Sequence, residues 1–292
     1  MSDQAQSLRE LVSNTSKGAR VLTITSGKGG VGKTSLAVNL AISLARLGLR
    51  VGILDADLGL ANVDIVLGLS PRYNLMHVVS GQKRLNEIVL PGPEGILVYA
   101  GGAGVFELAN LSQWRLERFV REIATLDATL DYLIVDTGAG ISRNVMSFVL
   151  ACDEVILVTT PELTAITDAY GVIKLIASQQ ENAKIRVVVN MARSEAEAEK
   201  VLKSLNLVVN QFVPNRLTLE MLGHIPPDAA VTMAIREQEP LILSHPGSKA
   251  ATQIQSIARR LVEDGIAQPP PRGVGALFQR MARLVRKRGN GI

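Results

Sequence analysis

The chain has 292 residues, of which 47% are hydrophobic, 20% charged and only 3% aromatic, and its mean hydropathy is +0.22. A composition so rich in aliphatic side chains can bury a large core, which excludes a disordered or low-complexity protein. The single cysteine, Cys152, excludes a disulfide framework and any zinc or iron–sulfur site built from the cysteines of this chain alone.

Charge is unevenly distributed along the chain. The formal net charge is +4 and the pI is near 9.3. Residues 1–271, however, hold 25 basic and 27 acidic side chains, whereas the tail from Arg272 holds six basic and no acidic ones. The body is therefore slightly acidic, and we expect no direct binding of nucleic acid through it.

The N-terminus carries Asp3, Arg9 and Glu10 where a signal peptide would need an apolar segment. No apolar run approaches the ~20 residues of a membrane-spanning helix. We expect a cytoplasmic protein that is peripheral on the inner face of the cell membrane when it contacts a membrane at all.

A short helix is predicted over residues 3–13, followed by a polar linker that ends at residue 18. Short β-branched runs then alternate with longer helical patterns. Strands are expected at Val21–Thr25, Val51–Leu54, Ile96–Tyr99, Tyr132–Val135, Glu154–Val158, Ile185–Val189 and Leu219–Leu222. Helices are expected at about 34–47, 112–127, 142–150, 164–180, 194–212 and 249–263.

This alternation of apolar strands and helices is typical of an α/β fold, a doubly wound, mostly parallel sheet with helices on both faces. The prolines of residues 268–273 predict an extended spacer after the globular part. The expected organisation is an N-terminal helix and linker (1–18), an α/β domain (19–267), the spacer (268–273) and an amphipathic tail helix (274–292).

A glycine-rich segment after the first predicted strand satisfies the pattern G-x-x-x-x-G-K-[ST] and opens a predicted helix, the context that a phosphate-binding loop requires. In such a loop backbone N–H groups surround phosphate oxygens, Lys33 reaches the β- and γ-phosphates, and Thr34 offers its hydroxyl to Mg²⁺. The alternative is a glycine-rich turn that matches the pattern by accident, but such a turn has no reason to lie between a strand and a helix. We therefore expect ATP and Mg²⁺ as ligands. The candidate nucleotide-binding residues here are Gly27, Lys28, Gly29, Gly30, Val31, Gly32, Lys33, Thr34 and Ser35.

The second lysine of the loop, Lys28 in GKGGVGKT, resembles the phosphate loop of the MinD/ParA family of P-loop NTPases. The resemblance implies that Lys28 contacts the phosphates bound by a second copy of the chain, so that ATP drives homodimerisation. It also implies a catalytic role for Lys28 beside Lys33. The alternative is a solvated loop lysine.

Aspartates follow two of the predicted strands at the edge of the sheet where ligands bind in this fold class. Asp136 ends one apolar strand and has the position of a carboxylate that helps to hold Mg²⁺. Asp55 and Asp57 end another. Resemblance to MinD-type enzymes implies that Asp57 orients the attacking water and that Asp55 supports the metal shell, although either could merely cap a turn.

Three further residues match positions that bind the base in this family. Asn190 follows the sixth predicted strand and would bind the adenine edge, and Pro226 and Asp228 follow the seventh and would flank the ring. These assignments come from the resemblance alone. The nearby His224 is interpreted as structural.

The tail has a strong helical pattern in which one arc is apolar and most of the rest is basic. Such a helix, after a proline spacer, is typical of an interfacial anchor on an anionic membrane, and pairing two of them in an ATP-bound dimer would strengthen binding. The alternative is an ordinary terminal helix docked on the body. The candidate membrane-binding residues are Val274, Leu277, Phe278, Met281, Leu284 and Val285.

The first residues resemble the D-Q-A-x-x-L-R start of the flagellar-number regulators of the MinD type, the FlhG, FleN or YlxH subgroup, as does the segment DTGAGIS from Asp136. In that subgroup the N-terminal segment stimulates the SRP-type GTPase FlhF. The resemblance implies FlhF and basal-body components of the flagellum as partners. The residues matched to the activating segment are Asp3, Gln4, Ala5, Leu8 and Arg9.

The function indicated by this resemblance is a membrane-cycling ATPase that regulates flagellar number or placement. Alternatives of the same fold are a division-site MinD, which normally lacks residues 3–18, and a DNA-segregating ParA, which would need a basic face on the body. Iron–sulfur carriers need paired cysteines. A ligase or amidotransferase-type enzyme would leave both termini unexplained.

Overall fold

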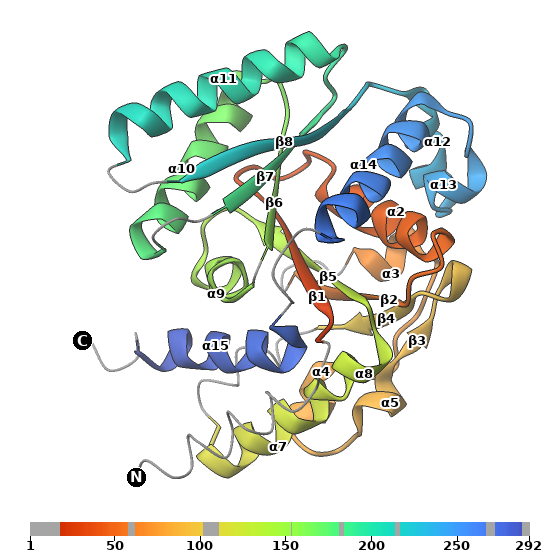
Figure 1. Cartoon of the computed structure of the whole chain (residues 1–292). Coiled ribbons are helices and arrows are strands. Elements are labelled where there is room, and N and C mark those ends of the chain that lie inside the picture. Colours follow the sequence, from red (N-terminus) through yellow and green to blue (C-terminus); the bar gives the residue numbers. More distant parts are fainter. Residues whose placement is uncertain are drawn as a thin grey trace.

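One sheet of eight strands runs through the described part of the molecule (Figure 1). The structure is a computed structural model, and it describes residues 18–57, 62–101, 111–152, 154–180, 184–213, 217–266 and 272–287. The strands are β1 (Arg20–Ser26), β2 (Val51–Ala56), β3 (Leu90–Pro91), β4 (Leu97–Ala100), β5 (Tyr132–Ala139), β6 (Glu154–Thr159), β7 (Lys184–Asn190) and β8 (Thr218–Ile225).

The strand order is β3-β4-β2-β5-β1-β6-β7-β8, and every pairing is parallel except that between β3 and β4. This confirms the α/β, doubly wound, mostly parallel fold. Since β5 lies between β1 and β2, the carboxyl ends of these three strands are neighbours, and Asp55 pairs in register with Asp136. The topology thus brings the phosphate-binding loop and the aspartates to one edge.

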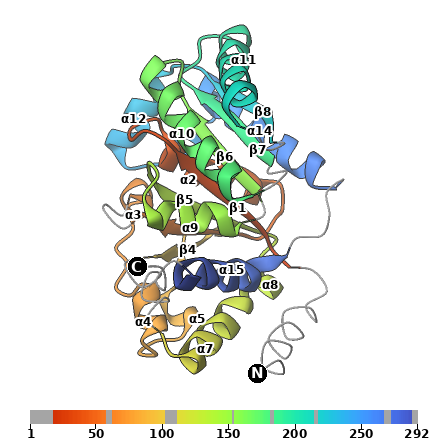
Figure 2. The same ribbon diagram turned by 90° about the vertical axis from the view of Figure 1, so that its left-hand side faces the viewer.

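Helices cover both faces of the sheet (Figures 1 and 2). The layer that contains α2 and α14 also holds α3, α12 and α13, and the opposite layer holds α4, α5 and α7 to α11 together with α15. The helices are α2 (Lys33–Arg46), α3 (Val63–Val66), α4 (Leu75–Val79), α5 (Leu85–Ile88), α7 (Gln113–Ala124), α8 (Leu126–Thr129), α9 (Arg143–Ala151), α10 (Leu163–Gln179), α11 (Glu195–Phe212), α12 (Ala229–Glu237), α13 (Leu241–Ser244), α14 (Lys249–Ile266) and α15 (Gly273–Lys287), with a 3₁₀ turn at Pro93–Gly95.

The differences from the expected elements are local. The predicted helix over 112–127 is divided at Thr125 into α7 and α8. The antiparallel edge strand β3 and helices α3, α4, α5 and α13 are two to five residues long. Such segments are too short to show a hydrophobic period, which is why the sequence did not reveal them.

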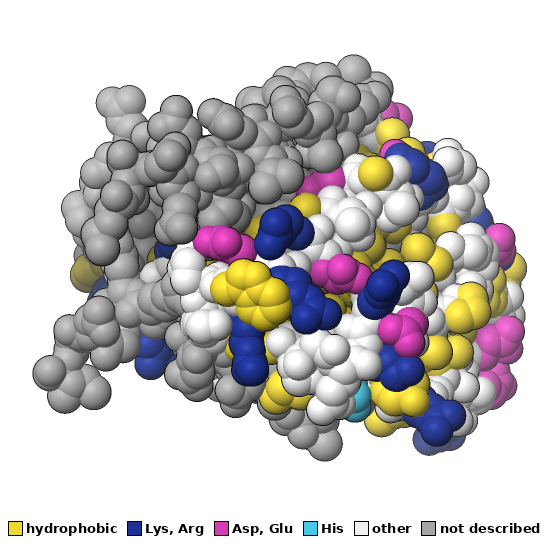
Figure 3. Space-filling model, turned by 90° about the horizontal axis from the view of Figure 1, so that it is seen from below, with side chains coloured by type: hydrophobic (Ala, Val, Ile, Leu, Met, Phe, Trp, Pro, Cys, Tyr) yellow, Lys and Arg dark blue, Asp and Glu magenta, His cyan; other side chains and the backbone are white. Residues whose placement is uncertain are grey.

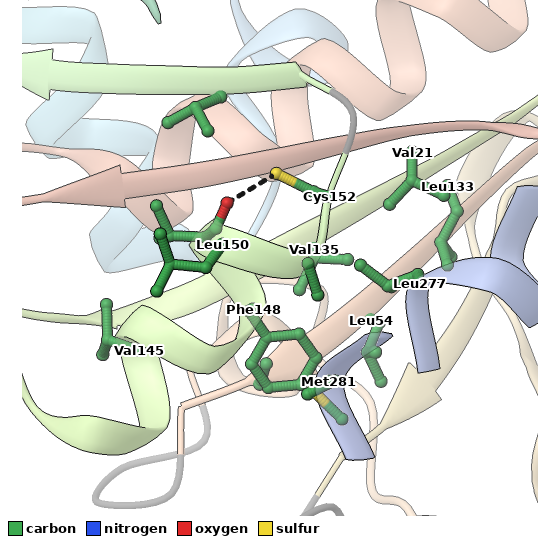
Figure 4. Packing of buried hydrophobic residues seen from close by; sticks show 14 of the residues in the cluster. Val21, Leu54, Leu133, Val135, Val145, Phe148, Leu150, Cys152, Leu277 and Met281 are labelled. Carbon is green, nitrogen blue, oxygen red and sulfur yellow. Dashed lines mark hydrogen bonds between the residues drawn. The ribbon is translucent and has the colours of Figure 1, made fainter. Parts of the chain in front are cut away.

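Helix α15 lies against the body, which corrects the expectation of a separate tail. Val274, Leu277, Phe278 and Met281 are each at most 1% exposed, and Leu284 packs at the edge of the same cluster. The ring of Phe278 meets Phe119 and Phe148 edge to face, with centroids 5.4 and 6.4 Å apart. Figure 4 shows Leu277 and Met281 turned toward Val135, Leu133 and Phe148. The apolar arc of α15 therefore covers the sheet between α7 and α9; the side chain of Val285 lies outside the described part.

A buried carboxylate fixes the first turn of α15. Asp127 accepts hydrogen bonds from the backbone N–H groups of Val274 at 2.7 Å and Gly275 at 3.3 Å, and also from Ala19 at 3.0 Å, just before β1. At Gly273, where φ is +86°, a Cβ would come within 2.8 Å of this carboxylate. The same side chain thus joins the segment just before β1 to the start of the C-terminal helix.

Several sequence assignments lie outside the described residues. These are the helix predicted over 3–13, with Asp3, Gln4, Ala5, Leu8 and Arg9, and the prolines of the spacer. Within the described ranges, none of the helices combines the length and the hydropathy needed to span a membrane.

Candidate nucleotide-binding site

The phosphate-binding loop connects β1 to α2, as predicted. Helix α2 begins at Lys33, and the preceding Gly32 has φ +88°, a left-handed conformation that favours glycine. At Gly27 a Cβ would overlap the backbone of Asp168 in α10, so the loop needs glycine there for close approach. With no side chains at these positions, backbone N–H groups at the N-terminus of α2 are available to an anion.

Thr34 and Asp136 form the centre of the site. The Thr34 hydroxyl donates to Asp136 Oδ2 at 2.6 Å, and Lys33 Nζ lies 3.8 Å from Asp136 Oδ1. Asp136 is fully buried, and its Oδ1 has no hydrogen-bond partner in the described structure. Burial raises the pKa of Asp136 to about 6, although the nearby Lys33 charge and the Thr34 hydrogen bond oppose the shift.

These donors fit Mg²⁺ of the P-loop kind. The described residues contain no group of three or more His, Cys, Asp or Glu that would enclose a metal by themselves. A P-loop site does not need one, because Mg²⁺ there keeps several waters and takes further oxygens from the phosphates. The protein would contribute to such a site the Thr34 hydroxyl and the buried Asp136 carboxylate, one oxygen of which has no hydrogen-bond partner among the described residues.

Asp55 and Asp57 lie beside this centre in different environments. Asp55 is buried and accepts hydrogen bonds from the backbone N–H groups of Asp57, Asn62 and Val63 at 3.0 to 3.1 Å. Burial raises the pKa of Asp55 above its ordinary range, although these three N–H groups oppose the shift. Asp55 thus ties together the two ends of the loop after β2, which fits a supporting role.

Asp57 follows β2 and is partly exposed. A Cβ added to Gly138 would lie 3.3 Å from Asp57 Oδ1, so the carboxylate sits next to the end of β5. The structure therefore brings Asp57 to the same edge of the sheet as Asp136, where a water-orienting carboxylate would be needed.

Lys28 points away from its own loop. Its Nζ donates to Glu162 Oε2 at 2.7 Å and to the Thr164 hydroxyl at 3.0 Å, and its side chain is 38% exposed. An exposed ion pair of this kind contributes about 0–1 kcal/mol, so it can exchange for a stronger partner. Glu162 and Thr164 were not expected from the sequence, although both follow β6 at the ligand-binding edge.

The predicted base-binding residues lie at the ends of β7 and β8, where Asn190 pairs in register with Ile225. Asn190 Nδ2 donates to the Val31 carbonyl at 2.8 Å, which braces the phosphate-binding loop. Pro226 follows β8 at the same edge.

Asp228 serves as the N-cap of α12. It accepts the backbone N–H groups of Ala230 at 3.0 Å and Ala250 at 3.1 Å, and backbone donors lower its pKa. Its carboxylate oxygens are thus engaged in capping. A contact of Asp228 with a base stays a prediction.

His224 lines a cavity of about 630 Å³ between α11, β8 and α14. The lining of this cavity includes Arg260 and Glu199 but no residue of the phosphate-binding loop. This position agrees with the interpretation of His224 as a residue outside the catalytic machinery.

Comparisons with known proteins agree with this geometry. The family model described as "ParA: NUBPL iron-transfer P-loop NTPase" matches residues 17–262. The chain is 39% identical to the antiactivator FleN of Pseudomonas aeruginosa, over 93% of this chain and 95% of that protein. It is 35% identical to the flagellum site-determining protein YlxH of Helicobacter pylori, over 91% and 90%.

Solved structures of MinD are similar as well. The chain aligns with the MinC:MinD cell division complex of Aquifex aeolicus with a TM-score of 0.65 and 27% identity, covering 84% of this chain and 96% of that one. It aligns with MinD complexed with Mg-ADP from Pyrococcus horikoshii with a TM-score of 0.65 and 26% identity, covering 86% and 99%. The solved relatives thus share the fold, and the Pyrococcus horikoshii protein was solved with Mg-ADP bound.

Proposed function

Because this chain belongs to the ParA/MinD family of P-loop ATPases, we propose that it is a nucleotide-switched, dimerising regulator of flagellar number or placement. The proposed switch rests on Lys28, whose side chain leaves the loop and contacts the exposed Glu162 and Thr164. The flagellar role is supported by near full-length similarity to FleN and YlxH at 39% and 35% identity. Septum site-determining MinD relatives are 32–34% identical over shorter shares of the chain.

The residues of the site suit slow hydrolysis of ATP. Phosphoryl transfer depends mostly on positioning and on neutralising charge. The loop N–H groups and Lys33 would bind the phosphates, and Thr34 and Asp136 would hold Mg²⁺, which would supply charge neutralisation at the phosphates. Asp57 would orient the water. Lys28 of a second copy would complete the site, so hydrolysis would depend on the dimer.

The flagellar role can be tested in the host. Cells that lack the protein should carry an altered number or placement of flagella, counted by electron microscopy. Expression of the intact protein should restore the normal pattern. An unchanged pattern in the deletion strain would count against the flagellar assignment and leave the ATPase assignment intact.

Membrane binding through α15 is part of this proposal, and it requires the helix to leave the body. The residues predicted to enter the membrane, with Phe278 and Met281 among them, are those now packed on the sheet. They cannot contact lipid and the sheet at once. The nucleotide-bound dimer would therefore have to favour the released helix.

Asp127→Asn should increase membrane binding in ADP, because α15 is released more readily. The substitution removes a charged acceptor from the backbone N–H groups of Val274 and Gly275, and a hydrogen bond to a charged group contributes about 1.5–3 kcal/mol. Cosedimentation of the full chain with phosphatidylglycerol vesicles in ADP measures the effect. Asp131→Asn is the control, because Asp131 lies four residues away and pairs with Arg50 rather than with α15. Equal binding of the two variants in ADP would contradict this role of α15.

The N-terminal segment is proposed to activate an SRP-type GTPase, FlhF. A synthetic peptide of residues 1–20 should accelerate GTP hydrolysis by that partner in a saturable way. The same peptide with Leu8 and Arg9 replaced by alanine is the control. No change in rate at saturating peptide would remove FlhF from the proposed partners.

A further inference from the structure

The outer surface of α7 combines a large aromatic side chain with three arginines, and we call these four residues the α7 face. Trp114 is 61% exposed, and Arg115, Arg118 and Arg121 are exposed along the following two turns. None of these arginines is within ion-pair distance of an acidic side chain in the described ranges. Figure 3 views the molecule from below, where basic side chains gather around an exposed hydrophobic one.

The acidic residues of the same helix already have partners. Glu117 accepts a hydrogen bond from the Gln113 side chain at 2.9 Å, and Glu122 accepts the backbone N–H of Leu85 at 3.0 Å. Inward-facing Leu116, Phe119, Val120 and Ile123 hold the helix on the core. The α7 face is thus a rigidly mounted cationic surface with an aromatic residue at one end.

Helix α15 packs directly beside α7 and extends this surface. No acidic residue occurs from Gly273 to Lys287, and Arg283 is exposed on the side of α15 away from the sheet. Helix α15 thus adds one exposed cation, Arg283, on the helix next to α7 while the apolar arc of α15 is still buried.

We propose that the α7 face lies against an anionic lipid surface while α15 is docked, and so forms a first membrane contact. A flat array of arginines complements anionic headgroups, and tryptophan favours the boundary between headgroups and acyl chains. Each basic residue near such a surface strengthens binding about fivefold. Continuity with α15 favours lipid over an acidic protein or nucleic acid. This inference deepens the membrane association proposed above, but it needs no release of α15.

The chain contains a single tryptophan, so its fluorescence reports on the α7 face alone. The full chain in ADP is mixed with vesicles of phosphatidylcholine and phosphatidylglycerol, or with phosphatidylcholine alone. We expect a blue shift of Trp114 emission, and quenching by brominated acyl chains, only with the anionic vesicles. Binding should weaken as salt is added, because screening acts on exposed charges.

Arg115→Gln combined with Arg121→Gln should weaken this binding about 30-fold, from about fivefold for each charge. The matched control is Lys200→Gln with Lys203→Gln, which removes two exposed cations from α11. Both pairs are on helix surfaces, and equal melting temperatures would verify that both variants fold. The α7 pair should lose the fluorescence change, and the α11 pair should keep it.

The result distinguishes this inference from the release of α15. Cosedimentation with ATP without any change in Trp114 emission would overturn the lipid contact of the α7 face and leave the proposed function standing. A change in emission with polyglutamate or duplex DNA but not with anionic vesicles would also overturn it, in favour of another partner. Equal weakening by the two pairs of substitutions would do the same.

Discussion

Lys28→Ala is expected to abolish the ATP-dependent dimer while nucleotide binding is retained. The Lys28 side chain leaves the loop toward Glu162 and Thr164, so its removal leaves the loop backbone and Lys33 in place. Across the dimer, loss of one partner from a desolvated charge pair costs about 2–5 kcal/mol, which weakens association about 30-fold or more. Light scattering with a slowly hydrolysed ATP analogue measures the dimer, and a fluorescent nucleotide measures binding.

A suitable control for this prediction is Glu162→Gln. It removes the charge that holds Lys28 within its own chain and keeps the lysine, so dimerisation should persist or become stronger. If Lys28→Ala dimerises like the unmodified chain, contact of the lysine with a second nucleotide is wrong. If both variants lose the dimer, the pairing of Lys28 with Glu162 is itself needed for assembly.

Asp136→Asn is expected to abolish hydrolysis and to stabilise the nucleotide-free protein at neutral pH. In the proposed site the carboxylate would help to hold Mg²⁺ beside the phosphates, and loss of one such electrostatic contact costs about 10²–10³ in rate. In the absence of ligand the same charge is fully buried with one oxygen unpaired, and an amide avoids that cost. Phosphate release and chemical denaturation in EDTA measure the two effects.

The pH dependence of this stabilisation has a defined sign. Burial raises the pKa of Asp136 to about 6 from the ordinary value of 3.8, so the folded state binds its proton more tightly than the unfolded state. The carboxylate therefore lowers the free energy of unfolding as pH rises from about 4 to about 6, by at most ~3 kcal/mol. Asp136→Asn should gain about 1–2 kcal/mol at pH 7.5, since it also loses the attraction of Lys33. At pH 4 the gain should vanish; a variant that is less stable at both pH values would contradict this account.

The periodic part of the fold could be predicted from the sequence. Seven of the eight strands and the long helices lie where the apolar runs indicated, because burial on both faces makes a parallel strand continuously apolar. The ends of the strands differ from the predicted ends where the extended backbone continues into polar residues. For example, β5 extends through Asp136 to Ala139. Short elements such as α4 and β3 gave no periodic signal.

The parts of the site that lie within one continuous segment could be predicted, because the residue types and their spacing are characteristic there. The loop from Gly27 to Thr34 and the carboxylate of Asp136 lie together as the motif and strand order require. Contacts between distant segments were not predictable. Glu162 binds a lysine 134 residues away, and Asn190 braces a loop 159 residues away.

The sequence by itself determined the parallel α/β architecture, the phosphate-binding loop and the amphipathic character of the tail, since each is encoded by residue types at short, regular spacing. Only the tertiary structure decided what the tail covers and what anchors it. An apolar arc specifies that a helix must be buried but not against which surface. Asp127 became an anchor for α15 because folding places a buried carboxylate under the first turn of a helix that begins 146 residues later.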